Sequence, residues 1–548
     1  MLSSRTISPV FPVFILCAAF GIVLLHPYLD HQDLLAQGDH GRDLYCFKKT
    51  FEGAAPYKDY WWEYGPLMPY YYSLFFKAFG VSIQSVLLGQ CILVLLCGTF
   101  LYLTAALVMS PWLALAAAMF FWVFRPDPFY TYNHIGATFL QIFILFCLLR
   151  QRISSNNMFF YFGLFGVFLL DLVRVNIGIA CLSAFLAGLA CDDHFKNAPQ
   201  RQKKLFIYAA AFFFTGLATA GAYFYFTRGV APAALKQCFP YFSSYRPDTA
   251  PPLKALVFFW KIVAMNFTAT WQRRIFGLIV LSASVRAGFL LIKNKLAQRE
   301  KADTLTVLLC LLVFLLFNVH EFLFSASVFR ISWFFPFGLL LFFVLIDRGL
   351  KGLPVFVRGA VPTVLLVIAV LGGLTKYQAA QSFRKDANLF QYGQSRVFVN
   401  NNSVPGQAKN QWVKTVTDAA DFLRRTTKDG PGKPVLALPY DALYYFLSGK
   451  DSAVYPLAFF KYLHITPQEE KAMIGRLEEQ KVDVVLLSNR SISSDPELGV
   501  FGVDYCPLLA EYIRENFGET AAFGDWQSLP GFTANHAVKI LRRKPPHR

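Results

Sequence analysis

Several signatures that mark common classes of protein are missing from this sequence. No Gly-rich phosphate loop of the GxGxxG or GxxxxGKS type accompanies its expected strands, so nucleotide binding has no support. The chain contains 10 cysteines, but no CxxC or paired spacing suggests a metal site or a disulfide framework. Internal repeats and low-complexity tracts are also missing, so nothing indicates a repeat protein.

Acidic residues are scarce relative to basic ones. The chain has 52 Lys and Arg against 34 Asp and Glu, which gives a formal charge of +18. A nucleic-acid partner would require these cations on one folded face with stacking aromatic residues between them. They lie instead largely in short loops between apolar runs, which is typical of the positive-inside pattern of membrane proteins. We therefore expect membrane lipids and no nucleic acid as partners.

Apolar residues dominate the composition. Of 548 residues, 55% are hydrophobic and 17% aromatic, and the mean hydropathy is +0.41. One soluble core does not accommodate so much apolar surface. Runs of about 16 or more apolar residues, enough to cross ~30 Å of hydrocarbon, predict a polytopic α-helical membrane protein with about eleven spans. The expected spans lie near residues 10–29, 82–108, 112–124, 134–149, 157–172, 177–191, 205–226, 275–292, 304–318, 331–346 and 359–374.

The positions of Lys and Arg predict the side of each loop. The first apolar run follows Arg5 and has no cleavage site behind it, which predicts an uncleaved anchor with a cytoplasmic N-terminus. Alternate loops are the basic ones, as the positive-inside rule requires. Residues 253–267 contain Lys254 and Lys261 and are interpreted as an interfacial helix on the outer side. The segments expected outside are 30–79, called here the first loop, 125–134, 227–274, 318–330 and everything after Thr375.

The pattern changes near residue 377 to short β-rich runs that alternate with amphipathic helices. We expect a transmembrane domain over 1–376 and a C-terminal extracytoplasmic α/β domain over 377–548. The C-terminal domain has no catalytic signature, and its expected role is to cover the cavity or to shape the choice of acceptor. The expected strands are 435–438, 482–487 and 536–541, and the expected helices are 419–425, 469–480 and 507–516.

The first loop carries most of the functional information. Asp39 and Asp43 are four residues apart, so they would share one face of a helix. The Tyr and Trp residues of this segment suit the boundary between water and lipid. From the residue types alone, an interfacial aromatic belt and a solvated Asp39 are the competing interpretations.

The order of residues in this loop resembles the first outer loop of the GT-C superfamily of glycosyltransferases. The similarity is greatest to the branch of the protein O-mannosyltransferases and aminoarabinose transferases. Two later stretches, around Arg174 and around Arg330 with Pro336, resemble the family's basic residue at the end of a middle helix and its late Arg followed by prolines. The residues that carry the resemblance in the loop are Asp39, Gly41, Arg42, Asp43, Leu44, Tyr45, Gly53, Pro56, Tyr57, Asp59, Glu63, Tyr64, Gly65, Pro66, Leu67, Pro69, Tyr70, Phe79 and Gly80.

The resemblance implies a GT-C-like architecture and an inverting transfer of a sugar from a polyprenyl-phosphate donor to an acceptor hydroxyl at the outer face. The acceptor is a glycan, a lipid or a protein, and the sequence does not name it. Asp39 is the expected general base, since the attacking hydroxyl must lose a proton. Arg174 and Arg330 are expected to stabilise the phosphate that leaves. The other expected substrate-binding residues are Arg42, Asp43, Tyr57, Glu63, Tyr64 and His320.

Two features depart from the pattern or leave it open. Many relatives carry an Asp-Glu pair in this loop, whereas His40 follows Asp39 here. Glu63, Asp43 and Asp127 are the candidates for the second carboxylate. A divalent metal also remains open, although His40, His134 and His320 show no ligand spacing that argues for one.

Two other functions compete with a glycosyltransferase. A lipid or polysaccharide transporter or flippase would need polar or broken helices at mid-membrane, and often an internal repeat. A non-catalytic envelope scaffold would bind a polysaccharide machine through its outer domain. For any of these functions, the lack of a disulfide framework in the outer domain favours a bacterial plasma (inner) membrane as the location.

Overall fold

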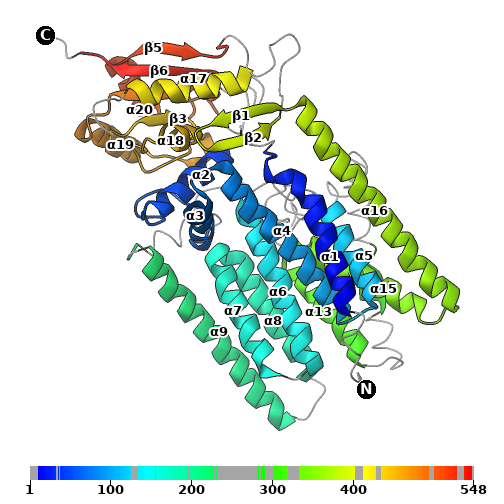
Figure 1. Ribbon diagram of the computed structural model, residues 1–548. Helices are drawn as coiled ribbons and strands as arrows, with labels where there is room; N and C mark the ends of the chain where they lie inside the picture. Colours follow the sequence, from blue (N-terminus) through cyan, green and yellow to red (C-terminus); the bar gives the residue numbers. More distant parts are fainter. Residues whose placement is uncertain are drawn as a thin grey trace. The chain divides into compact units, whose positions relative to one another are not determined.

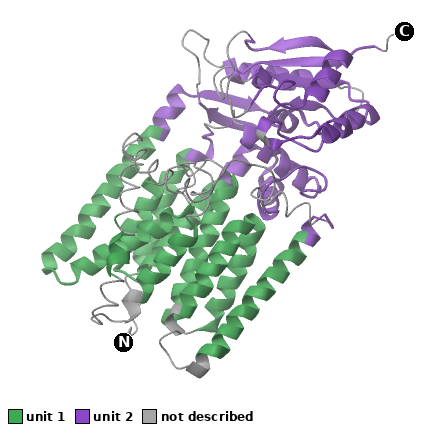
Figure 2. Cartoon of the chain, turned by 180° about the vertical axis from the view of Figure 1, so that it is seen from behind, with its two compact units in different colours: residues 1–27, 90–223, 248–379 green, residues 28–89, 224–247, 380–548 purple. Residues whose placement is uncertain are grey.

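The computed structural model describes the residues 10–32, 35, 38–124, 132–154, 156–193, 198–227, 229–230, 282, 285–290, 302–318, 333–400, 411–426, 433–492, 499–526 and 536–545. The chain divides into two compact units by the contacts between its residues (Figure 2). Unit 1 comprises residues 1–27, 90–223 and 248–379, and unit 2 comprises residues 28–89, 224–247 and 380–548.

Unit 1 is built from apolar helices (Figure 1). Three of them, α4, α9 and α16, continue into unit 2 at one end. Long apolar runs form helices in a bilayer because every backbone polar group is then satisfied within the segment. The helices are α1 Val10–Leu25, α4 Ile83–Ala106, α5 Pro111–Phe124, α6 Tyr132–Ser154, α7 Asn157–Val173, α8 Val175–Asp193, α9 Ala198–Phe226, α13 Ala302–Asn318, α15 Phe335–Leu350 and α16 Val355–Asp386.

These helices confirm the prediction of a polytopic membrane protein. Among the described residues, 5 helices are long and apolar enough to cross a membrane, and four shorter apolar helices accompany them. The number of spans stays a prediction, because most of the expected span 275–292 lies outside the described residues. The expected interfacial helix 253–267 also lies outside them.

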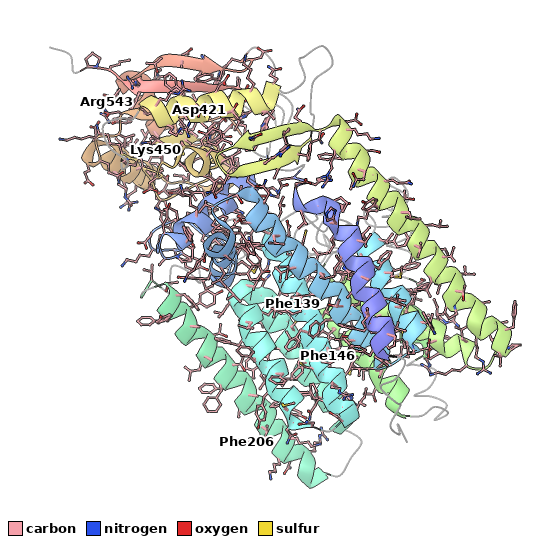
Figure 3. The ribbon with its side chains drawn as sticks, in the orientation of Figure 1. Phe139, Phe146, Phe206, Asp421, Lys450 and Arg543 are labelled. Carbon is pink, nitrogen blue, oxygen red and sulfur yellow. The ribbon has the colours of Figure 1, made fainter. Side chains whose placement is uncertain are left out.

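Small residues and aromatic rings pack the helices of unit 1 together. A methyl group on Gly98 of α4 would approach Trp122 Cε2 of α5 to 2.1 Å, so only glycine admits the indole there. The indole Nε1 of Trp122 donates to the Val94 carbonyl at 2.9 Å. Phe100 of α4 contacts Phe139 and Phe146 of α6 with ring centroids 5.4 and 5.8 Å apart (Figure 3). This contact fixes α4 against α6.

Unit 2 combines the first loop with a mixed sheet. The sheet has the order β3-β4-β6-β5, in which β3 and β4 are parallel and the other pairs antiparallel. A separate hairpin joins β1 to β2. The elements are η1 His26–Leu29, α2 Gly38–Phe51, α3 Leu67–Phe79, β1 Asn388–Tyr392, β2 Ser395–Val399, α17 Gln411–Thr426, β3 Leu436–Leu438, α18 Leu443–Ser448, η3 Lys461–Leu463, α19 Pro467–Glu479, β4 Val484–Ser488, η4 Asn489–Ile492, α20 Pro507–Asn516, β5 Phe517–Phe523 and β6 Val538–Arg543.

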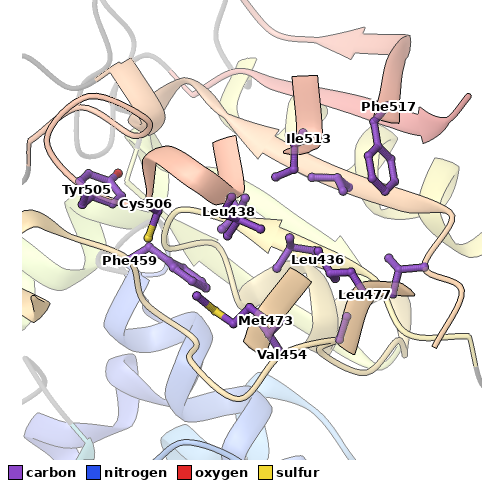
Figure 4. Close-up of a cluster of buried hydrophobic side chains, with 14 residues drawn as sticks. Leu436, Leu438, Val454, Phe459, Met473, Leu477, Tyr505, Cys506, Ile513 and Phe517 are labelled. Carbon is purple, nitrogen blue, oxygen red and sulfur yellow. The ribbon is translucent and has the colours of Figure 1, made fainter. Parts of the chain in front are cut away.

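The strands and helices expected after residue 377 are present, with shifted ends. Helix α19 begins at a capping box, in which Thr466 and Glu469 exchange hydrogen bonds. Apolar side chains of β3, α19 and α20 form a buried core (Figure 4). The labelled members of this core are Leu436, Leu438, Val454, Phe459, Met473, Leu477, Tyr505, Cys506, Ile513 and Phe517.

The first loop is folded against this C-terminal part of unit 2. The Asp30 carbonyl accepts the Phe398 amide of β2 at 2.7 Å. The Tyr45 hydroxyl of α2 accepts the Ser452 amide at 3.1 Å. The ammonium of Lys49 lies 2.9 Å from Asp451. Residues 28–89 therefore belong to the same unit as residues 380–548.

Candidate active site

Helix α2 carries the residues that the sequence analysis selected most strongly. Two glycines allow it to approach the C-terminal part of unit 2 closely. A methyl group on Gly38 would lie 2.2 Å from Tyr440 Cδ1, and one on Gly41 would lie 2.6 Å from the Leu443 amide nitrogen. A side chain at either position would force α2 away from these residues. The glycines therefore set the distance across which Asp39 and Arg42 meet Tyr440.

Arg42 is the centre of a buried polar cluster. Its guanidinium lies 2.6 Å from Glu63, 2.9 Å from Asp43 and 3.1 Å from Asp39. It also donates to the Tyr440 hydroxyl at 3.0 Å. We call these five residues, Asp39, Arg42, Asp43, Glu63 and Tyr440, the Arg42 cluster. Because Arg42 is only 2% exposed, these partners replace its hydration shell.

The aromatic rings of the first loop cover the guanidinium. The Trp61 and Tyr64 rings have centroids 5.7 and 5.5 Å from Arg42 Cζ. A cation held over aromatic faces gains ~0.5–2 kcal/mol per contact, more when it is desolvated. Burial alone would lower the pKa of Arg42, but Tyr440 and the carboxylates of Glu63, Asp43 and Asp39 raise it above its usual value. Arg42 therefore remains charged.

Asp43 lies inside the cluster and out of reach of solvent. It is 1% exposed, and one of its oxygens accepts from Arg42 Nε at 3.0 Å and from Nη2 at 2.9 Å. Burial raises the pKa of Asp43 to about 7; Arg42 opposes this increase, and Asp39 adds to it. An enclosed carboxyl group of this kind can orient Arg42 but has little surface left for contact with a substrate.

Asp39 differs from Asp43 in having an accessible side. Its side chain is 36% exposed and lies in the first turn of α2, where the positive end of the helix dipole favours a carboxylate. Oδ1 accepts from Arg42 and from the Tyr440 hydroxyl. Oδ2 has no hydrogen-bond partner among the described residues. One oxygen is thus held, and the other can accept a proton from a ligand.

Glu63, Tyr57 and Tyr64 complete the folded first loop. The Glu63 side chain is 22% exposed and bonds to Arg42. Tyr57 is 3% exposed and has a positive φ of 66°, and its hydroxyl donates to the Tyr64 carbonyl. The Tyr455 hydroxyl donates to the Tyr57 carbonyl at 2.8 Å. Tyr57 therefore holds the loop in shape, whereas Glu63 retains some exposure.

Arg174 belongs to unit 1 and interrupts two helices. It is the single residue between α7 and α8, with an extended backbone at φ −160° and ψ 100°. Its guanidinium lies 3.2 Å from His134 Nε2 and 5.3 Å from the centroid of the Trp333 ring. Asp171, three residues before Arg174, accepts from the Thr219 hydroxyl at 2.9 Å. The sequence did not predict the contact between Arg174 and His134.

Three of the expected residues, His320, Arg330 and Asp127, lie outside the described residues. The carboxylates of the Arg42 cluster do not form a metal site, because the guanidinium occupies the position between them. No group of three His, Cys, Asp or Glu that could hold a metal ion occurs within the described part of the chain. His40 is buried, and its Nδ1 lies 3.4 Å from the side-chain Nε2 of Gln32.

No protein-family model and no curated protein matches the chain. The oligosaccharyltransferase of Archaeoglobus fulgidus, solved with Zn and sulfate, superposes with a TM-score of 0.56 at 14% identity, over 95% of this chain and 73% of its own. Archaeal oligosaccharyltransferase AglB from the same organism, in complex with an inhibitory peptide and a dolichol-phosphate, has a TM-score of 0.53 at 13% identity, over 93% of this chain and 72% of its own. Both are GT-C glycosyltransferases. The chain has the GT-C fold.

The GT-C fold confirms the architecture that the order of residues in the first loop implied. ArnT from Cupriavidus metallidurans in the apo state has a TM-score of 0.46 at 12% identity, over 96% of this chain and 97% of its own. The structure brings Asp39, Arg42, Asp43 and Glu63, all selected from the sequence, together with Tyr440, which was not. Its position after the predicted strand 435–438 is the only signal that the sequence offers for it.

Proposed function

We propose that this protein is a glycosyltransferase that moves a sugar from a polyprenyl-phosphate donor to an acceptor hydroxyl, with inversion. The observation that carries the proposal is Asp39, whose Oδ1 is held by Arg42 and Tyr440 and whose Oδ2 has no partner among the described residues. The GT-C fold supports the reaction class. The dolichol-phosphate in one structural neighbour supports a polyprenyl carrier.

Asp39 acts as the general base. The acceptor hydroxyl hydrogen-bonds to Oδ2 and gives its proton to the carboxylate while its oxygen attacks the anomeric carbon. The bond between that carbon and the phosphate oxygen breaks, and the electron pair leaves with the polyprenyl phosphate. Attack opposite the leaving group inverts the configuration, and the proton then passes from Asp39 to solvent.

Arg174 stabilises the leaving phosphate in this proposal. A charge between two apolar helices is costly, so an arginine there is a functional candidate by default. The backbone of Arg174 is extended and interrupts the helix, and the guanidinium of Arg174 lies beside His134. Arg330 is proposed as a second cation for the leaving phosphate, as the resemblance implies, and His320 is proposed as a substrate-binding residue.

The proposed location is the plasma (inner) membrane of a bacterium, with the N-terminus in the cytoplasm. The first loop and residues 377–548 then face the outside, where a lipid-linked sugar meets its acceptor. The basic loops that alternate along the chain support this orientation. The boundary between the two proposed domains, 1–376 and 377–548, falls within α16, close to the limit of unit 1 at residue 379.

Transfer by the full-length protein in lipid vesicles tests the proposal. Vesicles receive polyprenyl-phosphate sugars together with candidate glycan, lipid and protein acceptors. We expect wild type to transfer a sugar and Asp39→Asn to lose ~10²–10⁴-fold in rate, the usual contribution of a general base. Asp421→Asn is the matched control, since this carboxylate pairs with Arg424 on α17, at the surface of unit 2. Movement of the lipid across the bilayer without transfer would indicate a flippase, and equal rates for all three proteins would contradict the role of Asp39.

A further inference from the structure

Tyr440 has a fixed position after β3. Its ring packs edge-on against Phe460 with centroids 4.8 Å apart. Gly38 of α2 lies directly against the ring. Arg490 Nη1 donates to the Tyr440 carbonyl at 2.9 Å. The cavity beside the ring has a volume of about 10 Å³, room for one water at most, so the ring has no second position to occupy.

A buried ionic brace supports the backbone at this point. Arg490 Nη1 lies 3.4 Å from Asp441 Oδ1, and the Ser488 hydroxyl donates to Asp441 Oδ2 at 2.5 Å. Asp441 and Arg490 are 5% and 8% exposed, so water does not screen their interaction strongly. The brace joins the end of β4 to residues 440 and 441 and fixes where the tyrosine hydroxyl points.

The hydroxyl of Tyr440 has two partners in the Arg42 cluster. It accepts from Arg42 Nη1 at 3.0 Å and donates to Asp39 Oδ1. A phenol has one hydrogen to donate, so the direction of both bonds is fixed. Burial raises the pKa of Tyr440 well above its usual value, so the hydroxyl keeps its proton at neutral pH.

We propose that Tyr440 is a positioning residue for Asp39, so that the C-terminal part of the chain supplies an essential group of the reaction site. This inference rests on the proposed function of Asp39 as base. Tyr440 holds Oδ1 in place and leaves Oδ2 available to the acceptor.

The Tyr440→Phe variant tests this role, because it removes the hydroxyl and keeps the ring. We expect kcat to fall ~10-fold, as for loss of one hydrogen bond to a charged group, while KM for the donor stays unchanged. A residue with a purely structural role would lower the amount of folded protein without lowering the kcat of the protein that folds.

Tyr444→Phe is the matched control. The Tyr444 hydroxyl is buried in the same unit but lies 2.8 Å from His536 Nε2 and does not contact Asp39. We expect this variant to keep the wild-type kcat, and the thermal unfolding of both variants is measured alongside. An inactive wild type, or an active Asp39→Asn, would contradict the proposed function itself. An active wild type and an inactive Asp39→Asn, with Tyr440→Phe keeping the wild-type kcat, would overturn the inference alone.

Discussion

Replacing Arg42 with methionine removes a cation that contacts three carboxylates. Asp39, Asp43 and Glu63 all lie within 3.1 Å of its guanidinium, and Asp43 is almost fully buried. Breaking a buried ion pair by removing one partner costs ~3–5 kcal/mol, because the other charge stays buried without compensation. In a unit of this size, such a loss lowers the midpoint of thermal unfolding by about 10 °C.

Tryptophan fluorescence follows the unfolding, and Trp61, which lies over Arg42, contributes to the signal. The deficit of Arg42→Met relative to wild type is expected to shrink as the pH falls from 7.5 to 5, because burial raises the pKa of Asp43 to about 7 and its protonation removes the uncompensated buried charge. Arg424→Met is the control, since Arg424 is 58% exposed and bonds to Asp421 at the surface. Exposed pairs are worth ~0–1 kcal/mol, so this variant should unfold close to wild type. Equal midpoints for both variants, or a deficit that grows towards low pH, would refute the account of the Arg42 cluster.

Three further predictions concern single positions. Burial raises the pKa of Asp43 to about 7, so its contribution to stability is complete below its ordinary pKa near 4 and is lost as the pH rises to 7. In wild type the free energy of unfolding should therefore fall between pH 4 and 7, and Asp43→Asn should flatten this fall. An unchanged slope in Asp43→Asn would contradict the prediction. Gly41→Ala places a methyl group 2.6 Å from the Leu443 amide nitrogen and should destabilise unit 2 by ~1–3 kcal/mol in denaturant titrations. Gly475→Ala on α19 meets nothing within 4 Å and should stabilise by up to ~1 kcal/mol, so equal effects of the two would contradict the close approach of α2. Arg174→Gln should lower kcat with vesicle-bound donor by ~10²-fold or more if this cation stabilises the leaving phosphate. A variant with the kcat of wild type would show that Arg174 does not act on the leaving group.

The helices of the membrane part were predictable because hydropathy over a fixed length is a local property of the chain. The spacing of Asp39 and Asp43 predicted that they share one face if their segment is helical, and α2 contains both. What the spacing could not predict was the difference between these two carboxylates. Asp43 is buried beside Arg42, whose partner Tyr440 lies 398 positions further along the chain.

The missed elements are short or depend on distant partners. β1, β2 and β5 have no strong alternation of apolar residues, and β5 pairs only with β6 through an irregular register. Helix α17 begins at Gln411, earlier than the expected start at residue 419. The prediction began late because fewer apolar residues lie in the first two turns than in the rest of the helix. The end of a helix near Arg174 was predicted, but its neighbour His134 comes from α6 and has no signal in the sequence.

The central claim is that Asp39 accepts the proton of an acceptor hydroxyl during sugar transfer. Mass spectrometry of reconstituted vesicles, which counts the polyprenyl phosphate released and the sugar gained by the acceptor, tests it most directly. The account predicts equal amounts of both products for wild type and a loss of at least ~10²-fold for Asp39→Asn. Equal product formation by wild type and Asp39→Asn would contradict it.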